Sequence, residues 1–241
     1  MAAPAAALDG RTALITGASR GIGAAVARRL SQAGARVALL ARSADALQAL
    51  ARELPGEPIV IAADLHHPGT AERAAQALAV ARAVPDIIVN NAGAFLVAPV
   101  AVTSVDDFRA TIEVNLVAPF AFVRTFLSGM QERGRGHIVT IGSIADRVTF
   151  PGNAAYAASK HGLRALHEVV RAELRGSGVR ATLVSPGPVD TELWNAIDTE
   201  SGGSFTPRAQ MLGADAVADA VCYALVAPVT LNVDEMRLSR S

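Results

Sequence analysis

The sequence predicts an α/β fold in which a doubly wound parallel sheet of seven strands is flanked by helices. Short apolar runs alternate along the chain with longer segments rich in alanine and arginine, which is typical of successive βαβ units. The apolar runs are almost uninterrupted and rich in β-branched residues, as in strands buried on both faces. A glycine-rich turn between the first run and the first helical segment belongs to the same architecture.

Each predicted strand is a short apolar run. Such runs fit strands better than helices because helical segments are longer and less continuously apolar. The first run leads into the glycine-rich turn, the fourth ends in two asparagines, and the sixth is followed by a proline-glycine turn. In chain order the strands are predicted at 12–16, 36–41, 58–62, 86–90, 137–141, 181–184 and 233–238.

The segments between the strands have the composition of helices. Gly34 and Gly176 follow two of them, where a C-cap residue is expected. Residues 186–213 mix proline, glycine, serine and threonine with isolated apolar residues. A loop of that length in a compact domain is more often functional than accidental, so we expect a lid over a substrate. The helices are predicted at 21–33, 44–54, 70–81, 105–130, 156–175 and 214–227.

Length and composition indicate a single domain spanning residues 1–241. The chain is 51% hydrophobic, which is enough to bury a sizeable core. Its 22 basic residues balance 22 acidic ones without a long block of either sign, so we expect no nucleic-acid partner. The single cysteine, Cys222, lies in an apolar helical pattern that favours a core position over a nucleophile. One cysteine permits no internal disulfide, which fits a reducing compartment.

We expect neither a leader nor a membrane anchor. Residues 1–8 are alanine-rich but lack basic residues, contain Pro4 and reach Asp9 too soon for a signal peptide. No uninterrupted apolar run approaches the ~18 residues of a spanning helix. The expected location is the cytoplasm.

The turn after the first strand, residues 16–23, reads TGASRGIG. Glycines permit a sharp turn and let a pyrophosphate approach backbone N–H groups, while the helix N-terminus offers about half a positive charge. The spacing G-x-x-x-G-x-G differs from the G-x-G-x-x-G of ordinary dinucleotide-binding folds. The turn is therefore either the phosphate site of a Rossmann-type fold or an ordinary glycine-rich loop.

The end of the second strand predicts the choice of cofactor. Enzymes that use NAD place a carboxylate there against the ribose hydroxyls, whereas this chain has Arg42. Arg42 and Arg20 could together bind a 2′-phosphate, although either alone would be an ordinary surface charge. We therefore expect NADP(H). Asp64, just past the third strand, either meets the adenine ring or is a plain turn aspartate.

Tyr156 and Lys160 stand four residues apart at the start of a helix, so their side chains share one face. Ser143 follows the fifth strand, which the topology brings beside that helix. Lowering a tyrosine pKa by about three units takes about 4 kcal/mol, and one cation supplies about one to three units. Lys160 alone is thus barely enough to lower the tyrosine pKa this far, and the positive charge of oxidised nicotinamide would complete the pKa shift. In reduction, Tyr156 would donate a proton and Ser143 a hydrogen bond to the carbonyl oxygen.

A tyrosine and a lysine at this spacing occur by chance on many helix surfaces, so other motifs decide. Residues 90–93, NNAG, close the fourth strand as a cofactor-side turn or as a generic Asn/Gly turn. Asn115 is an amide among apolar residues of a predicted helix. Residues 186–191, PGPVDT, follow the sixth strand at the carboxyl edge, where open α/β sheets bind ligands.

In this order, TGxxxGIG, NNAG, the asparagine, the serine, YxxxK and PGxV resemble the classical short-chain dehydrogenases/reductases over nearly the whole chain. The resemblance implies a catalytic tetrad of Asn115, Ser143, Tyr156 and Lys160. In that family the lysine also holds the nicotinamide ribose, and the asparagine helps to keep a water in a proton relay behind the tyrosine. It also implies a homotetramer or dimer packed through the helices at 105–130 and 156–175.

The resemblance further implies the cofactor contacts. The counterpart of Thr191 binds the carboxamide of nicotinamide, and Val189 contacts it through its backbone. Ala118 departs from the glycine that often follows the asparagine, a packing change that need not affect chemistry. The expected NADP(H) contacts are Gly17, Ser19, Arg20, Gly21, Ile22, Gly23, Arg42, Asp64, Leu65, Asn91, Ala92, Gly93, Tyr156, Lys160, Pro186, Gly187, Val189 and Thr191.

The expected substrate is an aldehyde, a ketone, or a 3-oxo or 3-hydroxy compound. Arg147 and Arg208 could anchor a carboxylate, although a solvated surface charge is the simpler interpretation of each. The histidines have no metal-site partners, so no metal is expected. The residues expected to line the substrate cavity, each of which could instead belong to the core, are Phe95, Ile144, Ala145, Val148, Phe150, Asn153, Trp194, Phe205 and Met211.

Two other functions remain open at this point. A non-catalytic NADP(H) sensor would keep the fold, but its mark would be a damaged tetrad, and all four members are present. An epimerase or dehydratase on the same fold would usually have a longer chain with a separate substrate region. An oxidoreductase that moves a hydride between NADP(H) and a carbonyl or alcohol fits the residues best.

Overall fold

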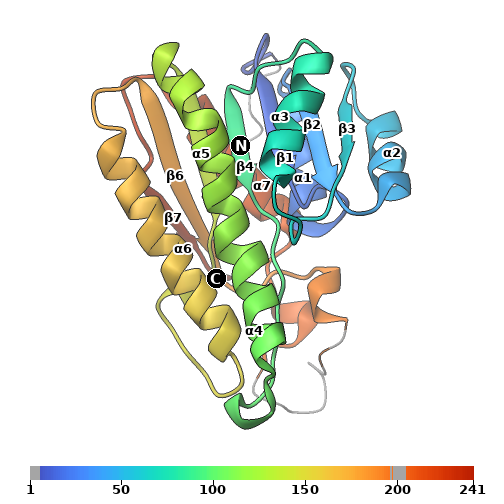
Figure 1. Ribbon diagram of the computed structural model, residues 1–241, viewed down its shortest axis with the longest axis vertical. Coiled ribbons are helices and arrows are strands. Elements are labelled where there is room, and N and C mark those ends of the chain that lie inside the picture. The colour runs from blue at the N-terminus through green and yellow to red at the C-terminus, as the bar shows by residue number, and fades with distance from the viewer. Residues whose placement is uncertain (1–5, 196, 198–204) are drawn as a thin grey trace.

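The computed structural model describes residues 6–195, 197 and 205–241, so parts of the N-terminal stretch and of the expected lid lie outside the described residues. A seven-stranded sheet runs through the centre in the order β3-β2-β1-β4-β5-β6-β7 (Figure 1). All of its neighbouring strands are parallel, which confirms the predicted fold class. The strands are β1 (Thr12–Thr16), β2 (Arg36–Ala41), β3 (Ile59–Ala62), β4 (Ile87–Asn90), β5 (Gly136–Ile141), β6 (Val179–Pro186) and β7 (Glu235–Leu238).

Helices cover both faces of the sheet. One apolar cluster joins α1, α2 and α7 to one face, and two further clusters join α3, α5 and α6 to the other. The inner strands β1, β2 and β4 point side chains to both faces and are almost wholly buried, which explains their continuous apolar sequences. The helices are α1 (Gly21–Gln32), α2 (Ala44–Glu53), α3 (Thr70–Val80), α4 (Val105–Ile112), α5 (Ala118–Glu132), α6 (Ala154–Glu173) and α7 (Ala214–Val226).

The register aligns the carboxyl ends of the central strands. Thr16 pairs with Leu40, and Asn90 pairs with Thr140. Because consecutive parallel strands end at the same edge, the turns that follow them gather there. This edge brings together the glycine-rich turn, the NNAG turn and the turn that carries Ser143.

The prediction of one continuous helix over 105–130 is wrong in detail. A π-helical turn, Glu113–Val117, separates α4 from α5. Such a turn inserts an extra residue into the helix and is frequent at functional sites. Asn115 lies in this turn with its side chain fully buried.

By length and composition alone, the segment Val105–Glu132 could cross a membrane, with a mean hydropathy of 1.3 over its most apolar window. In the fold, 44% of that window is buried, and Phe122, Val123 and Met130 pack against the sheet. The apolar composition of this segment is therefore accounted for by its packing against the sheet.

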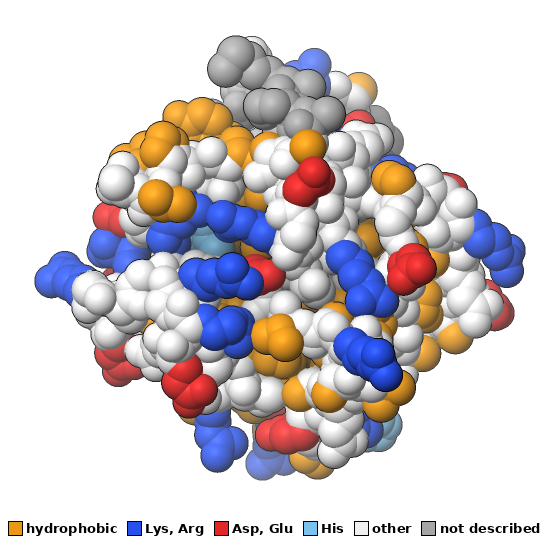
Figure 2. Space-filling model, turned by 90° about the horizontal axis from the view of Figure 1, so that it is seen from above, with side chains coloured by type: hydrophobic (Ala, Val, Ile, Leu, Met, Phe, Trp, Pro, Cys, Tyr) orange, Lys and Arg blue, Asp and Glu red, His pale blue; other side chains and the backbone are white. Residues whose placement is uncertain are grey.

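Several smaller expectations can be checked directly. Cys222 is 2% exposed, which confirms its core position. Within the expected lid, the described residues form two short 3₁₀ turns, Glu192–Trp194 and Arg208–Gln210, and Val189 bridges to Leu212. On the face shown in Figure 2, acidic and basic side chains lie interspersed rather than separated, as the balanced composition predicts.

Candidate active site

A cleft of about 830 Å³ opens at the carboxyl edge of the sheet. It is lined by the turns that follow β1, β2, β3, β4, β5 and β6 and by the start of α6. All of the expected cofactor contacts except Gly23 line this cleft. Three of the four members of the expected tetrad line it too, and Asn115 lies behind its wall.

The glycine-rich turn is shaped by close backbone packing. Gly17 and Gly21 have φ angles of +67° and +53°, a backbone conformation that residues other than glycine rarely adopt. A Cβ at Gly17 would lie 2.8 Å from the Cα of Ala92. At Gly23 a Cβ would lie 2.2 Å from the carbonyl oxygen of Gly17, so this glycine is needed for packing inside the turn, and it lies outside the lining of the cleft.

The N-terminus of α1 is open toward the cleft. Arg20, at the N-cap, has extended backbone and makes no side-chain capping bond, and the first turn contains no acidic residue. The first backbone N–H groups of the helix therefore have no capping side chain, and they carry the positive end of the helix dipole. This cradle fits an anionic group such as a pyrophosphate.

Two arginines and one aspartate also line the cleft near the glycine-rich turn. Arg20 and Arg42 are exposed and both line it, at the ends of β1 and β2. Asp64 accepts hydrogen bonds from the backbone N–H of His66 (3.0 Å) and approaches its Nδ1 (2.9 Å). The backbone bond to His66 is the main cause that holds the pKa of Asp64 below its usual value.

The NNAG turn is joined to the glycine-rich turn by hydrogen bonds. The Nδ2 of Asn91 donates to the carbonyl oxygens of Thr16 (2.9 Å) and Gly17 (3.3 Å). The Oγ1 of Thr16 accepts from the backbone N–H groups of Asn91 and Ala92, both at 3.1 Å. These bonds explain why a threonine, a glycine and an asparagine occur together at the ends of β1 and β4.

Tyr156, Lys160 and Ser143 meet at the other end of the cleft. Lys160 is 4% exposed, and its Nζ donates to the carbonyl oxygen of Ile141 (2.9 Å) and lies 5.7 Å from the ring centroid of Tyr156. The Oγ of Ser143 accepts from the backbone N–H of Ala145 (3.1 Å), which leaves its hydroxyl hydrogen free to donate. A hydrogen bond from Ser143 to Tyr156 favours the phenolate.

The pKa of Tyr156 moves opposite to the direction expected from its lysine neighbour. Burial raises it, and the negative charge of Asp146 adds to that effect, whereas only the hydrogen bond from Ser143 lowers it. Burial also lowers the pKa of Lys160 to about 8, against the opposing charge of Asp146. Desolvation is therefore the dominant effect on the pKa of Tyr156 in the protein alone, and Tyr156 holds its proton at neutral pH.

Asn115 connects the loop after β4 to α6. Its Oδ1 accepts from the backbone N–H of Ala94 (2.7 Å), and its Nδ2 donates to the Ala94 carbonyl and to the Oγ of Ser159, both at 2.9 Å. Ser159 in turn donates to the carbonyl oxygen of Tyr156 (2.7 Å). The asparagine side chain thus holds the wall of the cleft next to the tyrosine.

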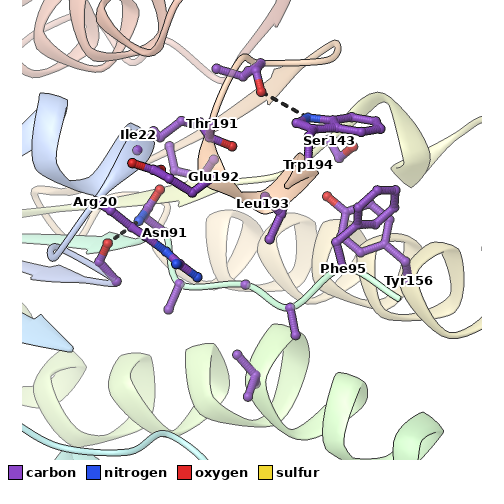
Figure 3. Close-up of a pocket in the computed structure, with 18 of the residues that line it drawn as sticks. Arg20, Ile22, Asn91, Phe95, Ser143, Tyr156, Thr191, Glu192, Leu193 and Trp194 are labelled. Carbon is purple, nitrogen blue, oxygen red and sulfur yellow. Dashed lines mark hydrogen bonds between the residues drawn. The ribbon is translucent and has the colours of Figure 1, made fainter. Parts of the chain in front are cut away.

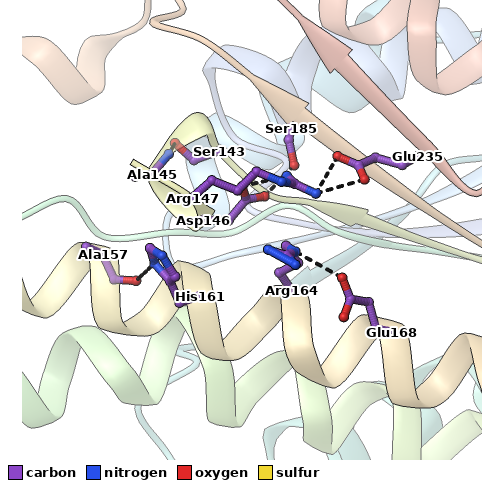
Figure 4. A network of polar contacts seen from close by, with 10 residues as sticks. All are labelled: Ser143, Ala145, Asp146, Arg147, Ala157, His161, Arg164, Glu168, Ser185 and Glu235. Carbon is purple, nitrogen blue, oxygen red and sulfur yellow. Dashed lines mark hydrogen bonds and ion pairs between the residues drawn. The ribbon is translucent and has the colours of Figure 1, made fainter. Parts of the chain in front are cut away.

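A buried carboxylate that no sequence motif indicated lies near Ser143 (Figure 4). Asp146 is fully buried, accepts from the Oγ of Ser185 (2.6 Å) and pairs with Arg147 (2.8 Å). Arg147 also forms an ion pair (2.8 Å) with Glu235, which lies on β7. This network ties the turn that carries Ser143 to β6 and β7.

Of the nine residues expected to line the substrate cavity, six line the cleft and three lie outside its lining. Val148 is 53% exposed and lies outside the cleft. Asn153 is buried and its Oδ1 accepts from the backbone N–H of Phe150 (3.2 Å), and Met211, within the expected lid, is buried. Figure 3 shows Phe95, Trp194 and Ser143 around Tyr156. The six that line the cleft are Phe95, Ile144, Ala145, Phe150, Trp194 and Phe205.

The two arginines considered as carboxylate anchors lie outside the cleft. Arg147 belongs to the buried network described above. Arg208 pairs with Asp190 (2.6 Å) and donates to Asn195 (2.8 Å) and to the carbonyl oxygen of Thr191 (3.1 Å). Both arginines thus hold loop residues in place through these contacts.

Other lining residues were missed. Glu192 and Leu193 directly follow the PGPVDT motif, so their nearness to it was the available signal. Ala94 likewise follows NNAG. Nothing in the sequence pointed to His66 or Thr206, because their position depends on the path of a loop.

Comparison with known proteins decides the family. The family model for short chain dehydrogenases matches residues 11–202. The chain belongs to this family. As a short-chain dehydrogenase, it belongs to a family of oxidoreductases, and it spans 62% of the length of the first curated relatives that it matches.

Individual relatives agree with this assignment. The dehydrogenase/reductase SDR family member 7B of Mus musculus is 36% identical over 199 residues, which are 80% of this chain and 62% of that protein. A D-threitol dehydrogenase of Mycolicibacterium smegmatis is 34% identical over 223 residues, 90% of this chain and 86% of the relative. A metagenomic short-chain oxidoreductase, solved in complex with NADP, superposes with a TM-score of 0.84 at 34% identity, covering 98% and 99% of the two chains.

Proposed function

We propose that this short-chain dehydrogenase is an NADPH-dependent carbonyl reductase with Tyr156 as its general acid. The observation that carries the proposal is the convergence of Tyr156, Ser143 and Lys160 on one end of a cleft. The opposite end of the same cleft is a glycine cradle at a helix N-terminus. A dinucleotide that lies along the cleft would therefore present its reactive end to the tyrosine.

The preference for NADP(H) over NAD(H) rests on charge. Arg20 and Arg42 both line the cleft near the end of β2, and no acidic residue stands at that strand end. Guanidinium groups bind a phosphate by paired, charge-assisted hydrogen bonds. The similar metagenomic oxidoreductase was solved with NADP, which supports the same choice here.

The proposed chemistry assigns one task to each side chain. A bound reduced nicotinamide supplies a hydride to the carbonyl carbon. Tyr156 donates its proton to the carbonyl oxygen, and Ser143 donates a hydrogen bond to the same oxygen. Lys160, held by the Ile141 carbonyl, stabilises the phenolate that the proton transfer leaves behind.

The pKa values favour the reducing direction. Burial and the charge of Asp146 keep Tyr156 protonated, and a proton donor must start in that form. Lys160, with a pKa of about 8, is mostly cationic at neutral pH. Both groups are thus in the state that carbonyl reduction requires.

The test is NADPH oxidation by the purified protein with aldehydes, ketones, 3-oxo acids and quinones, run beside Tyr156→Phe. Loss of a general acid typically lowers the rate by roughly 10²–10⁴-fold. We expect that loss with NADPH affinity within a few-fold of wild type, measured by fluorescence titration. Tight NADPH binding with no turnover of any carbonyl would contradict the proposal.

We also propose that the chain forms a homo-oligomer through α4, α5 and α6. Large apolar side chains are exposed along these helices, including Val105, Phe108, Phe120 and Val169. Exposed apolar surface of this kind is typical of protein–protein contacts. Light scattering is expected to give a dimer or tetramer, and a monomer at micromolar concentration would contradict this proposal.

A further inference from the structure

We infer that the substrate is an uncharged carbonyl compound with an aromatic or similarly bulky apolar group, and not an oxo or hydroxy acid. The inference rests on the proposed reductase function and deepens it. It follows from two features of the catalytic end of the cleft, namely the aromatic rings around Tyr156 and the placement of the cations.

The first feature is a continuous chain of rings. Phe95 packs edge-on against Tyr156 with centroids 4.7 Å apart, and Trp194 packs on Phe95 at 5.2 Å. Phe205 contacts Trp194 at 5.7 Å, and Phe150 contacts Phe205 at 5.6 Å. All four contacts are T-shaped, the arrangement that the ring quadrupoles favour.

The concentration of these rings is unusual for this chain. Only 4% of its residues are aromatic, and the seven phenylalanines, two tyrosines and one tryptophan make ten. Five of the ten form the ring chain, and all five line the cleft. Rings that line an open cleft offer their faces and edges to a ligand, so the surface beside the catalytic hydroxyl is suited to another ring.

Trp194 is held in place for this contact. Its Nε1 donates to the carbonyl oxygen of Val189 (3.0 Å), so its one polar group is satisfied within the protein. Phe95 packs against both Trp194 and Tyr156. A ligand group that reaches this surface therefore meets carbon atoms and no free donor from the indole.

The second feature is where the positive charges lie. The Lys and Arg side chains among the described lining residues are Arg20, Arg42 and Lys160. Figure 3 shows Arg20 at the opposite end of the cleft from Phe95 and Trp194. Arg42 follows β2, three strands from β5, which is about 14 Å at the usual strand spacing. Lys160 is bonded to Ile141 beneath the tyrosine.

Among the described residues, no other lysine or arginine lines the cleft beside the rings. Arg147 and Arg208 are engaged in ion pairs outside the cleft. The sequence of residues 196–204, AIDTESGGS, contains two acids and neither lysine nor arginine. A substrate carboxylate bound against Phe95 and Trp194 would lose its hydration without gaining a counter-charge, which is strongly unfavourable.

Matched pairs of carbonyl compounds test the inference with the wild-type enzyme and NADPH. We choose 4-phenylbutan-2-one and 4-oxopentanoate, which share a methyl ketone and a two-carbon linker but end in a ring and in a carboxylate. We expect kcat/KM to be at least 100-fold higher for the phenyl ketone. Equal values, or a preference for the carboxylate, would overturn the inference.

A second pair separates a neutral from a cationic ligand, because rings also bind cations. The pair is 3,3-dimethylbutanal and trimethylammonioacetaldehyde. The two aldehydes have nearly the same shape, but the quaternary atom is a neutral carbon in the first and a cationic nitrogen in the second. We expect the neutral aldehyde to have the higher kcat/KM. A higher value for the ammonium compound would show that the rings form a cation site and would overturn the claim of an uncharged substrate.

Variants link the preference to the rings. Trp194→Ala should lower the ratio of kcat/KM for 4-phenylbutan-2-one to that for propanal by at least 10-fold, and Phe95→Leu should lower it in the same direction. Tyr223→Ala is the control, because Tyr223 is 58% exposed and lies outside the cleft. An unchanged ratio in both folded cleft variants, checked by circular dichroism, would contradict the role of the rings.

Propanal distinguishes a failure of the inferred substrate class from a failure of the proposed reductase function. Reduction of propanal that depends on Tyr156, without the expected phenyl preference, would overturn the substrate class and leave the reductase intact. Absence of reduction of every carbonyl tested, with NADPH bound, would overturn the proposed function itself.

Discussion

The two ends of the cleft are built from different parts of the polypeptide. At the end near α1, the surface is mainly backbone, and glycines stand where a Cβ would collide with Ala92 or with the Gly17 carbonyl. At the end near α6, the surface is mainly side chain, with rings from the loop after β4, from the segment 186–213 and from the turn before α6. The first end is shaped to bind an anionic group through backbone N–H groups. The second end is shaped to bind the apolar surface of a ligand.

This difference teaches which changes each end can tolerate. Backbone that packs on backbone leaves no room for adjustment, so one methyl group there disturbs the whole turn. Side chains on loops can be exchanged while the sheet below them stays intact. Changes at the glycine end should therefore affect folding and cofactor binding, whereas changes at the aromatic end should affect the choice of substrate.

The largest effect is expected from Gly23→Ala. The new Cβ would lie 2.2 Å from the carbonyl oxygen of Gly17 and 2.6 Å from the Nδ2 of Asn91. We expect the free energy of unfolding to fall by about 4 kcal/mol or more and NADPH binding to be lost. Thermal unfolding measures the first effect and fluorescence titration the second. Gly213→Ala is the matched control, because a Cβ there meets nothing within 4 Å. Wild-type stability and affinity in Gly23→Ala would contradict the comparison.

A charge reversal at the polar end should come next in size. In Arg42→Asp we expect the ratio of kcat/KM for NADPH to that for NADH to fall roughly 100-fold, since a charge-assisted hydrogen bond contributes about 1.5–3 kcal/mol. Arg52→Asp, a reversal at an exposed arginine outside the cleft, serves as control. The assignment of Arg42 would be wrong if its variant kept the wild-type ratio.

A smaller effect is expected from Asp146→Asn, which removes a buried charge and keeps an acceptor for Ser185. The charge of Asp146 raises the pKa of both Tyr156 and Lys160, so its removal lowers both. Reduction needs both groups protonated, so activity should fall as pH rises, with a limb near the Lys160 pKa of about 8 in the wild type. In the variant this limb should move to lower pH, by about one pH unit.

The measurement is kcat/KM for reduction between pH 6 and pH 10, with Asp45→Asn as control because Asp45 is exposed on α2. A limb at the same pH in Asp146→Asn and wild type would show that this carboxylate does not act on the catalytic pair.

The glycine end of the cleft could be predicted from the sequence, because its residues are fixed by strand ends. Once β1 and β4 are recognised, the carboxyl edge places TGASRGIG beside NNAG without knowledge of any side-chain path. Periodicity also gave the order of the helices and strands. It did not reveal the π-helical turn at Glu113–Val117, because one inserted residue hardly alters an apolar pattern.

The aromatic end could be predicted only in part. Phe95 and Trp194 follow motifs at strand ends and were placed correctly, whereas Val148 and Met211 lie on irregular segments whose direction the sequence does not fix. Asp146 escaped notice because an acid in a turn after a strand is ordinarily exposed, and only the fold shows its partners Ser185 and Arg147. The strand boundaries differed by a few residues, as for β6 at Val179–Pro186 instead of 181–184.

The most direct test of the central claim follows the hydride itself. NADPH carrying deuterium at the transferable C4 position would be incubated with the enzyme and 4-phenylbutan-2-one, and the alcohol analysed by mass spectrometry. The proposed function predicts one deuterium at the carbinol carbon, formed by wild type and lost with the activity in Tyr156→Phe. An alcohol without deuterium, or labelled equally well by Tyr156→Phe, would contradict direct hydride transfer assisted by this tyrosine.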